Sequence, residues 1–221
     1  RGFAPINMTW RGCNDLAETM YYDDNVFYLN EIISNLDDAL KLDIDSDLFL
    51  DKFVEDIMFI ESILGQLYTA LKENDLLLAV KGAGHNIAGS GVCDGGMVID
   101  FARMRSVEVD PDRQAARVQP GCTLAEVDEA TQAYGLAVPT GINSTTGIAG
   151  LTLGGGFGWL SRKHGMTVDN LLSAQVVTAE GQIVTVSETE NPDLFWAIRG
   201  GGGNFGVVTS FEFHLHPIGP E

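Results

Sequence analysis

Two glycine-rich stretches constrain the fold of this chain more than any other feature. The first is Lys81-Gly82-Ala83-Gly84-His85-Asn86, and the second runs from residue 146 to residue 158 and contains six glycines. Main chain that lacks side chains can turn tightly and bring its N–H groups close to a ligand. Closely spaced amides of this kind suit a diphosphate, and the His85 ring adds a nucleophilic nitrogen beside it. The sequence therefore predicts two loops, about 60 residues apart, that grip one ligand from two sides.

The glycines do not form the fingerprint of a Rossmann dinucleotide site. That fingerprint is G-x-G-x-x-G at a turn from a strand into a helix, with an acidic residue about 20 positions later. The first stretch has Ile87 in place of the third glycine, and no clear strand precedes the second stretch. A third glycine run, at 200–206, follows a predicted helix and enters a predicted strand, which is the reverse order. A Rossmann fold is therefore the less favoured alternative.

Short strand patterns recur along residues 76–217. Apolar or alternating runs predict strands at 76–80, 97–101, 106–110, 115–119, 174–178, 183–186 and 206–215. In the last of these, alternation places on one face Val207, Thr209, Phe211, Phe213 and Leu215. The turn at 179–182 predicts a hairpin between its two flanking strands.

Two helix starts are visible between these strands. Thr123 and Glu126 have the spacing of a capping box, which predicts a helix from there to about residue 134. Asn191 is expected to cap a second, shorter helix with Pro192 at its first position. Because strands and helices do not follow a regular βαβ series, we predict an α+β domain with mixed sheets over residues 76–217.

Residues 1–75 have a different character, with 16 acidic and 5 basic residues and little glycine. Apolar residues spaced three and four apart at 26–40 and again at 50–71 predict an acidic helical hairpin. Two roles remain open for it, a packing layer on the domain or a coiled-coil surface for a dimer.

Three ordered blocks within residues 76–217 resemble a known family of flavoproteins. The blocks are 81–89, 141–158 and 191–208. They are similar to the FAD-binding (PCMH-type) domain of the vanillyl-alcohol oxidase and p-cresol methylhydroxylase family, in its berberine-bridge-like and 6-hydroxy-nicotine-oxidase-like branch. Members of that branch enter the domain through short strands, and these have no clear counterpart in residues 1–75.

The resemblance implies FAD as cofactor and a set of residues that contact it. In the first loop these are Lys81, Gly82, Ala83, Gly84, His85, Asn86 and Ser90. In the second stretch they are Thr145, Thr146, Gly147, Gly150, Leu151, Gly154, Gly155, Gly156 and Gly158. Near the end of the chain the main chain of Val207 and Val208 occupies matching positions.

The resemblance also implies a covalent bond between His85 and the flavin 8α-methyl carbon. Many relatives carry a second tether from a cysteine, and Asn143 stands at the matching position here, so a single histidyl link is expected. Two other residues depart from the family pattern. Lys81 replaces a common arginine, and Ala83 replaces a glycine, which would cost about 1 kcal/mol if that position needed a positive φ.

Composition limits the partners of the chain. A formal charge of −18 argues against nucleic acid and anionic membranes. Residues 130–161 carry no charge, but their glycines and polar residues argue against a membrane span. Cys13, Cys93 and Cys122 and the four histidines show no metal-binding spacing, so we expect no metal and a solvent-facing His214–His216 pair. No signal-like segment follows Arg1, which predicts a cytoplasmic protein.

Two functions fit these observations. In the first, the chain is the cofactor-binding part of an FAD-dependent oxidoreductase that oxidises a small organic substrate by hydride transfer to the flavin. The resemblance places a substrate domain after residue 221, so no general base is assigned here. In the second, the chain is a non-catalytic FAD-binding or interaction fragment that needs a partner chain or self-association.

Overall fold

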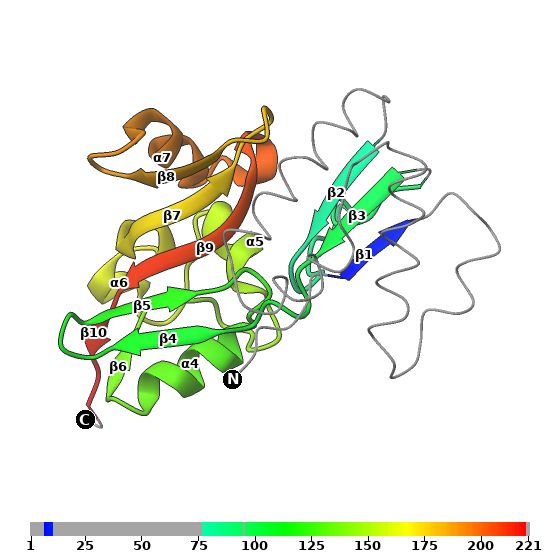
Figure 1. Ribbon diagram of the computed structural model, residues 1–221. Helices are drawn as coiled ribbons and strands as arrows, with labels where there is room; N and C mark the ends of the chain where they lie inside the picture. The colour runs from blue at the N-terminus through cyan, green and yellow to red at the C-terminus, as the bar shows by residue number, and fades with distance from the viewer. Residues whose placement is uncertain (1–6, 11–76, 95, 220–221) are drawn as a thin grey trace, which may run out of the picture.

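The computed structural model describes residues 7–10, 77–94 and 96–219 of the chain. Their strands form a five-stranded sheet, a three-stranded sheet and a two-stranded pair, with short helices around them (Figure 1). This arrangement confirms the predicted α+β fold with mixed sheets. The predicted helical hairpin at 26–40 and 50–71 lies outside the described residues, and the domain boundary near residue 76 stays a prediction.

All neighbouring strands of the larger sheet are antiparallel. Across the sheet the order is β4 (Val107–Asp110), β5 (Ala115–Val118), β9 (Val207–His214), β7 (Leu171–Val177) and β8 (Ile183–Ser187). The β7–β8 pair is the predicted hairpin, closed by a bond from the Thr178 amide to the Gln182 carbonyl. Strand β9 lies between the two hairpins at the centre of the sheet.

The face pattern of β9 differs from the prediction at its beginning. Val176 pairs with Val208 and Gln175 pairs with Ser210, so Thr209 is an extra residue in the ladder. Such a bulge shifts the alternation of side chains by one position. As a result Val208, rather than Val207 or Thr209, belongs to the same core cluster as Phe211.

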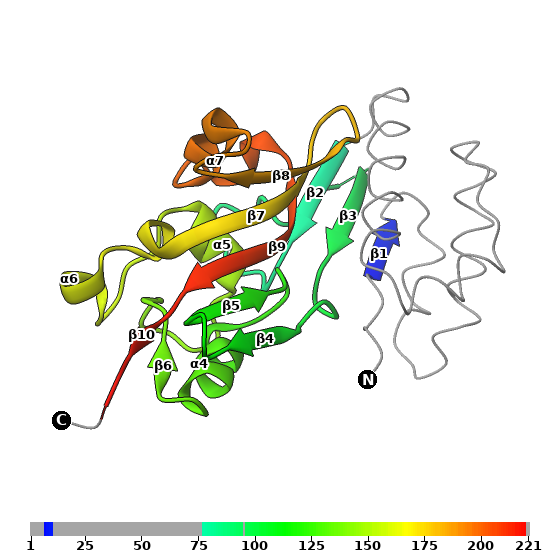
Figure 2. The same cartoon turned by 60° about the vertical axis from the view of Figure 1, so that its left-hand side comes forward.

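The smaller sheet carries the first glycine loop. Its order is β1 (Asn7–Trp10), β3 (Gly96–Asp100) and β2 (Leu77–Lys81), with β2 parallel to β3 and β1 antiparallel to it. Figure 2 shows this sheet beside the larger one, with the C-terminal ends of β2 and β3 directed toward the larger sheet. Strand β1 is an element that the sequence did not predict, since its pairing partner lies about 90 residues further along the chain.

Short helices fill the connections between these strands. They are α4 (Leu124–Gln132), α5 (Ile148–Leu153), α6 (Ser161–His164), α7 (Pro192–Ile198) and the 3₁₀ turns η1 (Thr167–Asn170) and η2 (Gly202–Phe205). A short antiparallel pair, β6 (Leu136–Ala137) and β10 (His216–Pro217), completes the fold.

The two predicted helix starts have different outcomes. Thr123 begins α4 as predicted, and its amide donates to Glu126 Oε2 at 2.8 Å. Asn191 directly precedes α7, but its side chain does not cap the helix. Instead its Nδ2 donates to the Thr185 carbonyl of β8 at 2.7 Å, and the residue takes a left-handed conformation with φ 47°.

One glycine outside both loops is required by close packing. A Cβ atom on Gly121 would overlap the carbonyl oxygen of Phe101 and lie 2.6 Å from that of Met104. We expect Gly121→Ala to lower the free energy of unfolding by about 1–3 kcal/mol, as overpacking does in other cores. Chemical denaturation measures the change. Gly203→Ala is the control, because a Cβ there meets nothing within 4 Å, and an equal loss in both variants would contradict the packing argument.

Burial of Cys122 makes the free energy of unfolding decrease at alkaline pH. Loss of water raises the pKa of this thiol from 9.0 to about 12, and the Glu126 charge adds to the effect. The folded state therefore holds the proton more tightly than the unfolded state. The stability that this contributes is present below pH 9 and is lost as the pH rises toward 12.

We expect the urea midpoint of the wild-type chain to fall more steeply above pH 9 than that of Cys122→Ala, because only the wild type has this buried thiol to ionise. Cys93→Ala is the matched control and should follow the wild type, since Cys93 is only half-buried. Parallel pH profiles for Cys122→Ala and the wild type would show that the thiol is not responsible.

Candidate functional site

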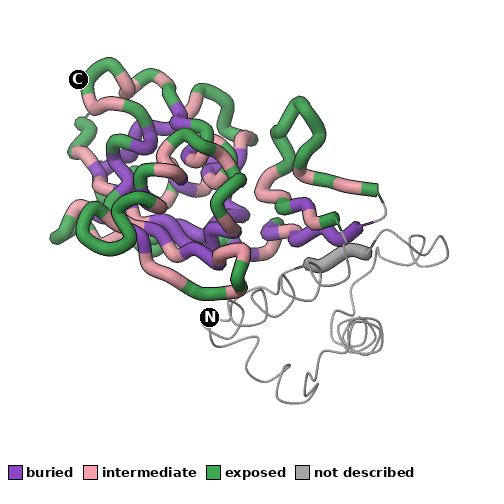
Figure 3. Tube along the Cα trace, turned by 90° about the horizontal axis from the view of Figure 1, so that it is seen from above, coloured by how far each residue is buried: buried purple, intermediate pink, exposed green. Residues whose placement is uncertain are grey.

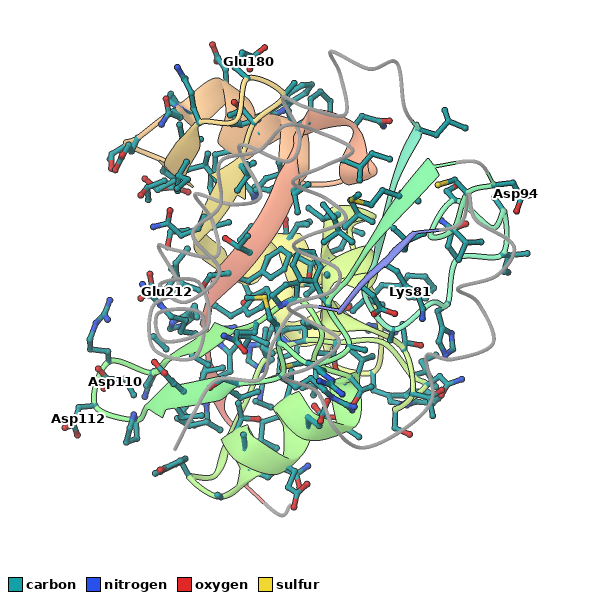
Figure 4. The ribbon with its side chains drawn as sticks, turned by 45° about the vertical axis from the view of Figure 1, so that its right-hand side comes forward. Lys81, Asp94, Asp110, Asp112, Glu180 and Glu212 are labelled. Carbon is teal, nitrogen blue, oxygen red and sulfur yellow. The ribbon has the colours of Figure 1, made fainter. Side chains whose placement is uncertain are left out.

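The first glycine loop begins where the two parallel strands of the smaller sheet end. Lys81 is the last residue of β2, and its Nζ lies 2.9 Å from Asp100 Oδ2 at the end of β3. The Phe101 amide donates to the Lys81 carbonyl at 2.9 Å. Figure 4 labels Lys81 here, far from Asp110, Asp112 and Glu180 at the tips of the hairpin turns. The ion pair fixes the point from which the loop departs.

The loop itself is an exposed excursion between β2 and β3. Residues 84–90 are all exposed, and Figure 3 shows them as the green loop beside the buried strands. Gly84 and Gly89 have φ values of 75° and 77°, which favour glycine. Gln114 and Asn191 are the only non-glycine residues of the described ranges with positive φ. Ala83 is therefore unstrained, and the 1 kcal/mol cost considered for it does not arise.

The structure brings the two glycine stretches into direct contact. A Cβ atom on Gly147 would lie 2.8 Å from the Ala83 Cβ and 2.9 Å from the Ala83 nitrogen. A Cβ atom on Gly82 would lie 3.8 Å from the Ala149 Cβ. The extra methyl group of Ala83 thus occupies the space that the missing side chain of Gly147 leaves free.

Helix α5 presents its first turn at this contact. Its N-cap is Gly147, and the Ile148 amide donates to the Cys122 carbonyl at 2.9 Å. The next two amides, those of Ala149 and Gly150, have no acceptor within the helix, and no hydrogen bond among the described residues uses them. Space is open beside Gly150, because a Cβ there meets nothing within 4 Å. Free amides beside open space are suited to an anion.

The later glycines of the second stretch have another role. A Cβ atom on Gly156 would overlap Thr167, and one on Gly158 would overlap the Thr140 carbonyl. Gly155, with φ 105°, lies against Met166. Gly156 and Gly158 need glycine because protein atoms approach them closely, and Gly155 needs it because of its positive φ. Contact of Gly154, Gly155, Gly156 and Gly158 with a cofactor remains a prediction.

His85 is linked to the second stretch by hydrogen bonds. Its Nε2 lies 3.1 Å from Thr145 Oγ1, and the Thr145 hydroxyl donates to Asn143 Oδ1 at 2.9 Å. All three residues are exposed. This bond joins the two stretches a second time, two residues beyond Ala83 in the first and two residues before Gly147 in the second.

The other predicted site residues lie in the first loop, on α5 and at the start of β9. Ser90 belongs to the first loop, where its amide donates to Asn86 Oδ1 at 3.4 Å. Leu151 packs toward Gly141 and is partly buried. Val207 and Val208 are buried at the start of β9, directly after Gly206. Whether these residues contact a cofactor remains a prediction.

Sequence reasoning missed Asp100 and undervalued Asn143. Asp100 pairs with Lys81 because β2 and β3 run parallel and end together, and the strand patterns alone do not show which strands are neighbours. In the sequence Asn143 stands out only as the replacement for a cysteine. Its contact with Thr145 could have been predicted locally, because an asparagine side chain often accepts a hydrogen bond from the amide two residues later, in an Asx turn.

The histidines near the end of the chain form a ring cluster instead of the expected solvent-facing pair. His164 of α6 stacks on His216 with ring centroids 3.9 Å apart, and His214 meets His216 edge to face at 4.7 Å. Partial burial, with His164 and His214 nearby, lowers the pKa of His216. Within the described ranges no group of three or more histidine, cysteine or acidic residues could hold a metal ion.

Comparison with known proteins places this site in a family. The family model described as FAD binding domain matches residues 64–187, more than half of the chain. The FAD-linked oxidoreductase pgmH of Aspergillus terreus is 53% identical over 125 residues, 57% of this chain and 25% of that protein. The (R)-6-hydroxynicotine oxidase of Paenarthrobacter nicotinovorans is 40% identical over 146 residues, 66% of this chain and 32% of that protein.

Solved structures agree with these matches. The crystal structure of 6-hydroxy-D-nicotine oxidase from Arthrobacter nicotinovorans is similar with a TM-score of 0.69 and 38% identity, over 71% of this chain and 35% of that one. The curated relatives are longer, and the chain spans between 24% and 40% of their length. In the part of the chain that the structure describes, no helix has the length and apolar character to cross a membrane. The chain belongs to the FAD-binding domain family, in the branch that includes 6-hydroxynicotine oxidase and BBE-like proteins.

Proposed function

We propose that this chain is the cofactor-binding part of an FAD-dependent oxidoreductase that oxidises a small organic substrate and carries its flavin on His85. The observation that supports this most strongly is the contact between Ala83 and Gly147, which joins the two loops close to the hydrogen bond between His85 and Thr145. Relatives with this domain are named as oxidases of hydroxynicotine and of xylooligosaccharide. A substrate domain that lies outside this chain would select the substrate.

The residues at the contact fit the chemistry of FAD. The free amides at the start of α5 and the glycines of the first loop would bind the diphosphate. The imidazole of His85 would hold the flavin ring by a covalent bond. When bound, FAD accepts the hydride of the substrate and passes the electrons to dioxygen or another acceptor. The protein contributes binding, orientation and the anchor.

Asn143 and the buried Cys122 both support a single covalent link, through His85. A related glucooligosaccharide oxidase from Acremonium strictum is described as carrying a 6-S-cysteinyl, 8α-N1-histidyl FAD. In this chain Asn143 stands in the second loop where a cysteine would be needed. Cys122 is buried, and its raised pKa of about 12 keeps the thiol protonated and unreactive.

A second candidate is a non-catalytic FAD-binding or interaction fragment. Two large aromatic side chains beside the second loop favour it, because Phe157 is 69% exposed and Trp159 is 82% exposed. Apolar surface of this kind is typical of a face that another chain or domain covers. Turnover with candidate alcohols, amines and sugars separates the two functions, since a fragment that only binds FAD would stay oxidised with all of them.

Intact mass spectrometry tests the flavin link directly. We expect the purified chain to carry the added mass of FAD, and His85→Ala to lose it, because Asn143 stands at the position of the second tether and cannot replace the histidine. His164→Ala is the matched control, since His164 lies on α6, outside both loops, and it should keep the added mass. A wild-type chain that neither carries FAD nor binds it when it is added would overturn the proposal.

Two glycine substitutions separate loop contact from cofactor binding. Gly147→Ala should push Ala83 away, and we expect it to destabilise the chain by about 1–3 kcal/mol and to abolish FAD binding. The methyl group that Gly150→Ala adds points into open space, and alanine favours a helix more than glycine does. The free energy of unfolding should therefore stay equal or rise by up to about 1 kcal/mol. FAD binding should nevertheless fall in Gly150→Ala, because its methyl group would occupy the proposed diphosphate space. Thermal unfolding and FAD titration together check both, and unchanged FAD affinity in Gly150→Ala would move the diphosphate elsewhere.

A further inference from the structure

Three polar side chains lie in a row where the two loops meet. Thr145 is in the middle, 3.1 Å from His85 Nε2 on one side and 2.9 Å from Asn143 Oδ1 on the other. The main-chain N–H of Thr145 also donates to Asn143 Oδ1, at 3.1 Å. In each of these bonds one atom donates and the other accepts. Together these assignments determine which nitrogen of the His85 ring carries the proton.

The direction follows from counting hydrogens. A main-chain N–H can only donate, so the Asn143 atom that receives it is the amide oxygen and acts as an acceptor. The Thr145 hydroxyl has one hydrogen, and it donates this hydrogen to the same oxygen. Thr145 Oγ1 can therefore only accept from His85. His85 Nε2 must carry the hydrogen of that bond, which leaves the lone pair of the neutral ring on Nδ1.

The turn that holds Asn143 and Thr145 is itself anchored. The Thr146 amide donates to the Asn143 carbonyl at 3.0 Å, which closes the turn. The amides of Leu124 and Ala125, at the start of α4, donate to the carbonyls of Thr146 and Ser144 at 2.9 and 3.0 Å. The acceptor for His85 is therefore positioned by the end of a helix and not by a free loop.

We propose that Asn143 and Thr145 are positioning residues that hold His85 as its Nε2–H tautomer and so make Nδ1 the nitrogen that bonds to the flavin. The tautomer rests on the hydrogen bonds alone, whereas its use rests on the proposed function. Asn143 thus stands at the position of the second tether, and it orients His85, the first tether, through Thr145.

The covalent step balances with this tautomer. The lone pair of Nδ1 forms the new bond to the 8α-methyl carbon, and that carbon loses one proton. The electron pair of the broken C–H bond passes to the isoalloxazine ring, and the Nε2 proton leaves to solvent, which the exposed His85 ring allows. Dioxygen then takes two electrons and two protons and becomes hydrogen peroxide.

Nitrogen NMR of the 221-residue chain, prepared without flavin, tests the tautomer. Two-bond proton–nitrogen spectra distinguish a ring nitrogen that carries hydrogen from one that carries a lone pair, and His85→Ala assigns the signals. We expect the wild type and Thr145→Ser to show hydrogen on Nε2. Thr145→Val, which keeps the shape and removes the acceptor, should give a mixture, and Asn143→Ala should shift partway toward it. Ser144→Ala, in the same turn but outside the row, should match the wild type.

The rate of covalent FAD incorporation, followed by intact mass, tests the use of the tautomer. We expect Thr145→Val to slow incorporation by a factor on the order of ten, the effect of one hydrogen bond, and Thr145→Ser to restore it. A wild-type Nε2 without hydrogen, or a Thr145→Val spectrum equal to that of the wild type, would overturn the inference. A chain with hydrogen on Nε2 that never links FAD would leave the tautomer in place and overturn the covalent attachment, and with it the role of the two residues.

Discussion

The site depends on one close contact, between the methyl group of Ala83 and the bare Cα of Gly147. It joins a loop that leaves a parallel strand pair to the first turn of α5, whose Ile148 belongs to the core cluster of the antiparallel sheet. The residues that approach each other there, Gly82, Ala83, Gly147 and Ala149, have no side chain longer than a methyl group. The amides of Ala149 and Gly150 are therefore left uncovered, and the hydrogen bond from His85 to Thr145 connects the same two segments.

The glycines of the second stretch divide into two groups that look identical in the sequence. Gly150 faces open space, whereas Gly156 and Gly158 face protein atoms so closely that a side chain would not fit. The first kind leaves room beside the helix, and the second allows the packing that holds the segment after α5 against Thr140 and Thr167. One glycine-rich stretch therefore contains both an open position and positions that close packing requires.

Most elements could be predicted from local patterns, because a capping box, a hairpin turn and apolar runs are properties of neighbouring residues. The features that could not be predicted depend on partners far along the chain. Strand β1 exists through its pairing with β3, and the Lys81–Asp100 bond exists because β2 and β3 end together. The bulge at Thr209 reflects the register against β7, and the histidine cluster needs α6 to fold over β10. For the site, the loops and His85 could be predicted from the sequence. The hydrogen bonds around His85 could not, because they join residues about 60 positions apart.

The place of β9 in the large sheet has a consequence for how the chain matures. This strand comes last of the five in the sequence, yet it separates the β4–β5 hairpin from the β7–β8 hairpin. Until it leaves the ribosome, both hairpins present an open edge that can pair with another chain. Synthesis as far as residue 200 thus leaves the two hairpins apart, and the larger sheet closes only when β9 is inserted between them.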